Sequence, residues 1–227
     1  MKDIALNKNE FLSNSNIVPI NIKEKEFDIL MNIYTMAINQ VLDIINGIQT
    51  KYKSVYEDNI INHTTSRIKA PESIIKKMQK KKLELSYRNL VDNINDIAGV
   101  RVVCPTKDNI YTIVKIIEKI PNWRIIKLKD YIKSPKKSGY SGYHIIVEVP
   151  ILMGNKNCKE IFVKVEIQIR TMAMDFWATN EHKMKYKTNK RLSYWDSKRL
   201  MVYAKILKIL DDKFMKINQK MKVKNMS

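Results

Sequence analysis

Glycine, proline and cysteine are all scarce in this sequence of 227 residues, which contains 5 Gly, 6 Pro and 2 Cys. So little glycine and proline excludes collagen-like and low-complexity chains, and 44% hydrophobic residues suffice for a core. Cys104 and Cys158 fit neither a metal-binding spacing nor a disulfide framework, which is typical of a reducing compartment. No run of about 18 apolar residues occurs, and residues 1–16 lack the apolar centre of a signal peptide. We therefore expect a cytoplasmic protein that does not enter a membrane.

Several common nucleotide and metal motifs are also absent. The sequence contains no GxxxxGK[ST] phosphate-binding loop, no GxGxxG after a predicted strand and no HExxH zinc motif. Its three histidines, His63, His144 and His182, are followed by Thr, Ile and Lys, so no His-Asp pair exists. These absences argue against P-loop NTPases, Rossmann-type dinucleotide enzymes, zinc proteases and metal-dependent hydrolases of the His-Asp type.

Acidic residues are few relative to basic ones: 23 Asp and Glu stand against 42 Lys and Arg, a formal net charge of +19. An excess of this size attracts polyanions, which include nucleic acids, nucleotides and acidic membrane surfaces. The alternative is that much of the lysine only solvates the surface of a chain rich in Lys, Asn and Ile. Charge alone does not decide between these interpretations.

Hydrophobic periodicity predicts an α+β fold. One mixed sheet of about four or five strands is expected, flanked by helices, with long helices towards both ends of the chain. The expected helices are 27–52, 71–85, 108–120, 172–186 and 200–221, with Thr171 as the cap of the fourth. The expected strands are 98–105, 123–130, 143–149 and 161–169.

Residues 1–20 are polar and are expected to form a flexible lead-in to a single domain over 21–227. The motifs of this domain fall within 60–190, and its C-terminal helices fall within 193–222. The apolar stripes of the outer helices have two interpretations. They are buried within their own domain, which is the more frequent outcome for such a stripe, or they face a second subunit.

The stretch VKVEIQIRT, 163–171, alternates between apolar and polar residues, which is typical of a strand with two different faces. Its polar face carries Glu166 in the centre. A second carboxylate, Asp96, shortly precedes the predicted strand 98–105. Two carboxylates on neighbouring strands can hold Mg²⁺ together with the phosphate oxygens of a substrate. Taken singly, Asp96 has the alternative of a turn residue, and Glu166 that of an ordinary residue on a solvated strand face.

Two of the five glycines, Gly139 and Gly142, enclose Tyr140 in the loop 130–144, which also contains three lysines. Glycine permits close approach of the backbone to a ligand, lysines supply charge for phosphates, and a tyrosine ring can stack on a base. The segment 66–77 adds four basic residues around a helix N-terminus, which suits phosphate. The alternatives are an exposed turn and a basic surface helix. Together these segments predict a site for several phosphates, a divalent metal and at least one base.

Four motifs, SRIKAPESI, NDIAGVRVV, SGYSGYH and VEIQIRTMAMDFWATNEHKMKYK, follow one another in the order and spacing of a known family. Over residues 60–190 the chain resembles the synthetase domain of the RelA/SpoT proteins. It is similar to the small alarmone synthetases of the RelQ and RelP type. The resemblance implies a nucleotidyltransferase-like synthetase fold.

The activity that the resemblance implies is transfer of the β,γ-diphosphate of ATP to the 3′-hydroxyl of GDP or GTP. Some members also use GMP as the acceptor. The products would be AMP and ppGpp or pppGpp, and the cofactor would be Mg²⁺. The resemblance also implies a homo-oligomer, a tetramer by analogy, with single-stranded RNA or (p)ppGpp as regulators.

Individual residues also match positions with known roles in the family. Asp96 resembles the Mg²⁺-binding aspartate, and Glu166 resembles the catalytic glutamate near the metal and the attacking hydroxyl. The positions that match ATP-binding residues are Arg67, Lys69, Ser73, Lys77 and Arg101. The positions that match the GDP or GTP side are Lys129, Lys136, Tyr140, His144, Gln168 and Asp175, with Tyr140 as the ring that stacks on guanine.

Two other functions compete with this interpretation. Another nucleotidyltransferase would normally show a Gly-Ser pair followed by two carboxylates in a DxD pattern, and no Gly-Ser pair occurs. An RNA-binding module would interleave aromatic and basic residues on an exposed sheet, whereas the aromatic residues here are concentrated in the Gly-Tyr loop and the helices. Release of AMP from ATP in the presence of a guanine nucleotide distinguishes the synthetase from the binding module.

Overall fold

The computed structural model describes residues 24–153, 159–187 and 192–224. The predicted lead-in 1–20 lies outside these residues. The elements are α2 (Glu24–Tyr56), β1 (His63–Ile68), α3 (Pro71–Lys80), α4 (Tyr87–Asn93), β2 (Ala98–Cys104), α5 (Lys107–Ile117), β3 (Arg124–Asp130), β4 (Tyr143–Met153), β5 (Lys159–Thr171), α6 (Met172–Lys187) and α7 (Tyr194–Lys224).

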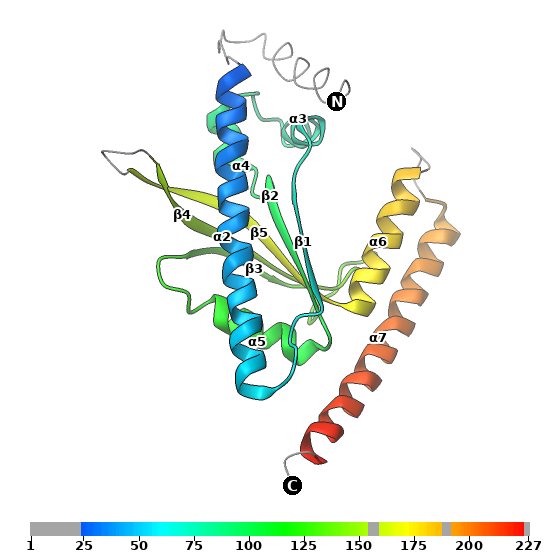
Figure 1. The fold of residues 1–227 in the computed structure, drawn as a ribbon. Coiled ribbons are helices and arrows are strands. Elements are labelled where there is room, and N and C mark those ends of the chain that lie inside the picture. The colour runs from blue at the N-terminus through cyan, green and yellow to red at the C-terminus, as the bar shows by residue number, and fades with distance from the viewer. Residues whose placement is uncertain (1–23, 154–158, 188–191, 225–227) are drawn as a thin grey trace.

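Five strands form one twisted sheet in the order β1-β2-β5-β4-β3 (Figure 1). The neighbours β2 and β5 run parallel, and the other three pairs run antiparallel. The predicted α+β class with a mixed sheet of four or five strands is confirmed. Because β5 lies in the middle of the sheet, its side chains have neighbours from β2 on one side and from β4 on the other.

One face of the sheet forms the hydrophobic core together with α2 and α5. The long helix α2 lies across this face, as Figure 1 shows. Ala37, Val41 and Ile45 of α2 are fully buried, as is Ile167 at the centre of β5. The apolar residues of β5 therefore face the core, as the alternating sequence pattern predicted. The polar residues of β5 lie on the opposite face of the sheet.

Two elements, β1 and α4, are missing from the sequence prediction, and the predicted helix 71–85 ends at Lys80. Strand β1 lies at the sheet edge and is mostly exposed. Main-chain pairing with β2 holds it in place, so its sequence shows no alternation of apolar residues. Helix α4 has seven residues and buries one of them, Leu90; Ser86 caps its start by accepting from the backbone N–H of Asn89. After α3 the chain turns at Lys82, whose φ is 57°.

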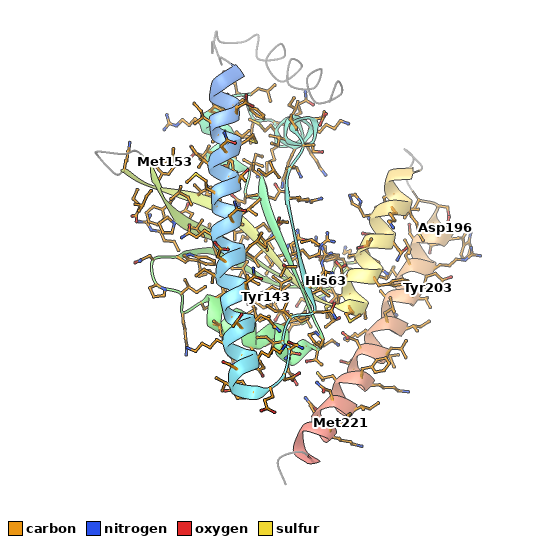
Figure 2. All side chains as sticks on the ribbon, in the orientation of Figure 1. His63, Tyr143, Met153, Asp196, Tyr203 and Met221 are labelled. Atoms are coloured by element: carbon orange, nitrogen blue, oxygen red, sulfur yellow. The ribbon has the colours of Figure 1, made fainter. Side chains whose placement is uncertain are left out.

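Helices α6 and α7 form a pair that lies beside the sheet and away from α2 (Figure 1). Thr171 caps α6 as predicted, since its hydroxyl accepts from the backbone N–H of Met174 at 3.3 Å. Leu200 of α7 is buried, but most of the predicted apolar stripe is exposed: Tyr203, Leu210, Phe214, Ile217 and Met221. Figure 2 shows how far the side chains from Tyr203 to Met221 extend beyond the sheet. Burial within the same domain, the more frequent outcome, therefore does not hold for this stripe among the described residues.

None of the helices that the structure describes is both long enough and apolar enough to cross a bilayer.

Candidate functional site

The strand register brings many of the predicted residues to one face of the sheet. Residues that pair directly across neighbouring strands point to the same face. Glu166 of β5 pairs with Gly99 of β2, which pairs with Arg67 of β1. The next row on the same face contains Arg101, Gln168, His144 and Lys129, contributed in turn by β2, β5, β4 and β3. This is the face opposite the core.

A cavity of about 180 Å³ opens on this face. The carboxylates of Asp96 and Glu166, which lie far apart in the sequence, both line it. Arg67 and Arg101, two of the predicted ATP-binding residues, also belong to its lining, together with Gln168. The absence of a side chain at Gly99, directly beside Glu166, helps to leave this space open.

Asp96 is held by two lysines. Its Oδ1 lies 2.7 Å from Nζ of Lys77 on α3, and its Oδ2 lies 3.2 Å from Nζ of Lys69 at the end of β1. Burial alone would raise the pKa of Asp96, but the two lysines outweigh burial and hold the pKa below its usual range. The carboxylate is therefore charged at neutral pH, and two ammonium groups are already concentrated at the position predicted for phosphate.

Glu166 accepts two hydrogen bonds, from Nδ1 of His144 at 2.9 Å and from the amide of Gln168 at 2.7 Å. Burial favours a higher pKa for Glu166, yet the bonds from His144 and Gln168 lower the pKa overall. The charge of Asp96 acts in the opposite direction and favours protonation of Glu166, because the two carboxylates face the same cavity.

Arg170 connects Glu166 to the Gly-Tyr loop through two chains of hydrogen bonds. In the first chain, Arg170 donates to the amide oxygen of Gln168 at 2.8 Å, and Gln168 donates to Glu166. In the second, Arg170 donates to the hydroxyl of Tyr140 at 2.9 Å, this hydroxyl contacts Nε2 of His144, and His144 reaches Glu166. Together the two chains form a closed network of hydrogen bonds, in which the donors lead from the guanidinium of Arg170 to the carboxylate of Glu166.

Arg170 belongs to this network, although the sequence prediction did not include it among the candidate site residues. It is only 5% exposed, so its charge must be compensated within the protein. Asp175, in the first turn of α6, accepts from Arg170 at 3.0 Å and lies 3.3 Å from Arg101. Burial and the neighbouring Arg170 lower the pKa of Arg101, although Asp175 opposes this effect. The position of Arg170 on the polar face of β5 was the available signal.

Tyr140 lies beside the site, but its ring is enclosed. It is 8% exposed and packs edge-on against Tyr131, His144 and Trp177. Burial raises the pKa of its hydroxyl, although Arg170 opposes this. In this conformation Tyr140 is a structural member of the hydrogen-bond network. Stacking of its aromatic ring on a base would require one face of that ring to be uncovered.

Eight predicted residues lie outside the cavity lining. Five of these, Lys69, Lys77, Tyr140, His144 and Asp175, belong to the contacts described above, and the other three do not. Ser73 lies in the first turn of α3, where its backbone N–H donates to the carbonyl of Ala70. Lys129 is exposed on β3 as the strand neighbour of His144. The ammonium group of Lys136 lies 4.7 Å from the centre of the Tyr140 ring. These residues are close to bound nucleotides only if the substrates extend beyond the cavity.

The cavity offers a metal ion two carboxylates, those of Asp96 and Glu166. Among the described residues, no group of three or more His, Cys, Asp or Glu side chains is arranged to hold a metal. Mg²⁺, however, is usually bound by one or two carboxylates and completed by substrate phosphates and water. Asp96 and Glu166, both charged and facing one cavity, fit this kind of site.

Comparison with known proteins gives a consistent result. The family model described as the region found in RelA and SpoT proteins matches residues 66–191. GTP pyrophosphokinase YwaC of Bacillus subtilis is 38% identical over 187 residues, which cover 82% of this chain and 88% of YwaC. The crystal structure of small alarmone synthetase 2 from the same organism is 36% identical with a TM-score of 0.77, and the match covers 86% of this chain and 99% of that chain.

A second solved structure is that of small alarmone synthetase 1 from Bacillus subtilis bound to its product pppGpp. It is 30% identical with a TM-score of 0.79, over 86% of this chain and 98% of that chain. The family model covers more than half of the chain, and these relatives match along nearly their whole length. The resemblance seen in the four motifs is thus confirmed, and the chain belongs to the RelA/SpoT family.

Proposed function

We propose that this protein is an alarmone synthetase, which transfers the β,γ-diphosphate of ATP to the 3′-hydroxyl of GDP or GTP and releases AMP. The observation that carries the proposal is the convergence of Asp96 and Glu166 on one cavity lined by arginines. The membership of the RelA/SpoT family and the similarity to a GTP pyrophosphokinase support it.

On the donor side, Arg67 and Arg101 would flank the adenine of ATP, and Lys69 and Lys77 would meet its phosphates. Both lysines now pair with Asp96. An incoming polyphosphate competes for them and frees the carboxylate of Asp96 for a divalent ion. Asp96 and Glu166 would hold this Mg²⁺, which supplies neutralisation of charge on the transferred phosphates.

On the acceptor side, Glu166 would receive the proton of the 3′-hydroxyl. Its lowered pKa makes it a weak base, so we assign most of its effect to charge and alignment rather than to proton removal. His144 donates to Glu166 through Nδ1, which orients the carboxylate. Lys129, Lys136, Gln168 and Asp175 surround the same region and would position the guanine nucleotide, whose base would stack on Tyr140.

The direct test is to incubate the purified protein with ATP, Mg²⁺ and GMP, GDP or GTP in parallel, and to separate the nucleotides by chromatography. We expect AMP together with a 3′-diphosphorylated guanine nucleotide, and neither product when Mg²⁺ is removed with EDTA. The Asp96→Asn variant should bind nucleotide but form little product. Absence of AMP with all three acceptors would reject the synthetase and favour the RNA-binding module.

We also infer that the chain forms a homo-oligomer, a tetramer by analogy with small family members, and that it works in the cytoplasm, where its nucleotide substrates are found. The exposed apolar stripe of α7 supports the assembly, because monomers rarely expose contiguous apolar surface of this kind. Phe214→Asp places a charge in the stripe and should lower the mass measured by light scattering. The formal charge of +19 supports regulation by an anion, with single-stranded RNA and (p)ppGpp as the candidates.

A further inference from the structure

A second cavity, of about 320 Å³, lies between the α6–α7 pair and the loop 131–141, and we call it the rear pocket. It shares no lining residue with the cavity that Asp96 and Glu166 line. Its apolar wall is formed by Ile132, Pro135, Met174, Trp177, Met201 and Leu207. The volume falls at the lower end of the range for small-molecule sites, which is about 300–1,000 Å³. The space is therefore sufficient for one small apolar group of a ligand.

The rear pocket has a basic rim. Lys136, Lys137, Lys205 and Lys208 belong to its lining, and within the part of the chain that the structure describes none of these four forms an ion pair. A fifth lysine, Lys107, is already neutralised by Asp211 and Asp212. The combination of an apolar wall and uncompensated ammonium groups is complementary to an anion that carries an apolar body.

The wall of the rear pocket is built from fixed parts. The indole N–H of Trp177 donates to the carbonyl of Leu200 at 3.0 Å, which holds the ring between α6 and α7. The hydroxyl of Thr171 binds Asp211 at 2.9 Å and anchors α7 to the end of β5. A preformed wall requires little ordering when a ligand enters, which favours binding.

We propose that the rear pocket binds a small organic anion, an aromatic ring bearing a phosphate or carboxylate group. The ring would lie against Trp177 and Leu207. The anionic group would meet the ammonium groups of Lys205 and Lys208 on α7 and of Lys136 and Lys137 on the loop.

The rear pocket also contacts the loop that carries the proposed acceptor residues. Gly139, with φ of 94°, packs so closely on α7 that an added Cβ would lie 2.6 Å from Cβ of Ala204. Lys136 lines the rear pocket, while its ammonium group lies 4.6 Å from the ring centre of Tyr131 and 4.7 Å from that of Tyr140. An anion that attracts Lys136 away from these rings would loosen Tyr140. This second step rests on the proposed function, in which Tyr140 receives the guanine base.

Binding is tested by calorimetric titration of the full chain with 1-naphthyl phosphate, compared with 1-naphthol and with inorganic phosphate. The aryl phosphate should bind at one site per chain, and either half alone should bind at least about tenfold more weakly, because each half loses one set of contacts. The double variant Lys205→Gln, Lys208→Gln should weaken binding by a similar factor. The matched control is Lys213→Gln, Lys216→Gln, which removes the same charge from α7 outside the rear pocket.

Three results would overturn the site. These are no binding of 1-naphthyl phosphate, an equal loss of binding in the control double variant, and displacement of the probe by GDP, which would make the pocket part of the acceptor site. An apparent Kd that weakens as protein concentration rises would instead indicate a second copy of the chain over the pocket, and would also overturn the proposal. The Ala173→Leu variant, which fills the pocket from α6, gives an independent check and should abolish binding while thermal unfolding remains cooperative.

The coupling to the acceptor side is measured separately. Saturating 1-naphthyl phosphate should change KM for GDP at least about threefold with little change in kcat, and the Lys205, Lys208 double variant should lose this effect. An unchanged KM with intact binding would reject the coupling. Because the calorimetry does not depend on turnover, failure of the synthetase assay and failure of the site are distinguishable.

Discussion

On one face of β5, Val165, Ile167 and Ile169 are completely buried in the core with α2 and α5, whereas on the other face Glu166 and Gln168 line a cavity. The first face is satisfied by any well-packed apolar side chains of suitable volume. The second requires particular groups, since specific hydrogen bonds join Arg170 to Gln168 and Gln168 to Glu166. One strand thus contributes to the core on one face and to the candidate site on the other, and the two faces should respond differently to mutation.

The polar face is partly buried, with His144 and Arg170 the most enclosed, which explains why it is organised as a closed network of hydrogen bonds. A buried charge without a partner is strongly unfavourable. Arg170 is 5% exposed and contacts Asp175, Gln168 and Tyr140, so its charge is compensated. Glu166 is compensated in the same way by His144 and Gln168. The arrangement of the polar face therefore depends on a hydrogen-bond network, whereas that of the apolar face depends on the volume of its side chains.

The largest effect is expected from Glu166→Gln, which changes the polar face without altering its size. Loss of the charge should lower kcat by about 10²- to 10³-fold, the usual effect of removing one preorganised electrostatic group from an active site. The free energy of unfolding at neutral pH should change far less. Single-turnover assays and urea unfolding measure the two quantities. The control is Glu160→Gln, an exposed carboxylate on the same strand, which should keep full activity. An active Glu166→Gln enzyme would remove the residue from the mechanism.

The opposite change is Ile167→Ala on the apolar face. Ile167 is fully buried, so the truncation should lower the free energy of unfolding by about 2–5 kcal/mol. At temperatures where the variant remains folded, its kcat should stay within a few-fold of the wild type, because no group of the cavity is removed. Chemical denaturation and steady-state assays on the same preparation test this separation. A loss of kcat as large as that of Glu166→Gln would show that the faces are not independent.

The sequence predicted much of this division. Both faces of β5 follow from its alternation, and the positions of Asp96 and Glu166 in one cavity agree with the idea of a shared metal. Strand β1 escaped prediction because an edge strand is held by main-chain bonds that leave no side-chain pattern. The position of Arg170 in the network depends on Tyr140, His144 and Asp175, which come from three other segments. A local sequence pattern carries no information on contacts between segments that are distant in the chain.

A smaller effect is expected from Tyr140→Ala, at the edge of the polar face. If the ring stacks on guanine, its loss should cost about 1–3 kcal/mol of binding and raise KM for the guanine nucleotide about five- to 150-fold. Tyr140→Phe keeps the ring but loses the hydroxyl that contacts His144 and Arg170. It should affect kcat more than KM, because it breaks one chain of the hydrogen-bond network. Equal KM values for the wild type and the alanine variant would contradict stacking.

The smallest effect concerns pH, to which the polar face of β5 should respond and its apolar face should not. The folded-state pKa values of Asp96 and Glu166 lie below their ordinary values of about 3.9 and 4.3. The unfolded chain therefore binds more protons in this range. The stability that these carboxylates contribute is complete above about pH 5 and is lost as the pH falls through the lowered pKa values. Urea unfolding from pH 7 to pH 3 should show this decline.

Comparison with single variants assigns the decline to the polar face. The difference in unfolding free energy between the wild type and Glu166→Gln should shrink below about pH 4, since a protonated glutamate and a glutamine are both neutral. Asp211 should act in the opposite direction, because burial raises its pKa despite Thr171 and Lys107, so that protonation stabilises the fold. Asp211→Asn should therefore steepen the decline. A difference between the wild type and Glu166→Gln that stays constant from pH 7 to pH 3 would mean that Glu166 gains no stabilisation from the groups around it.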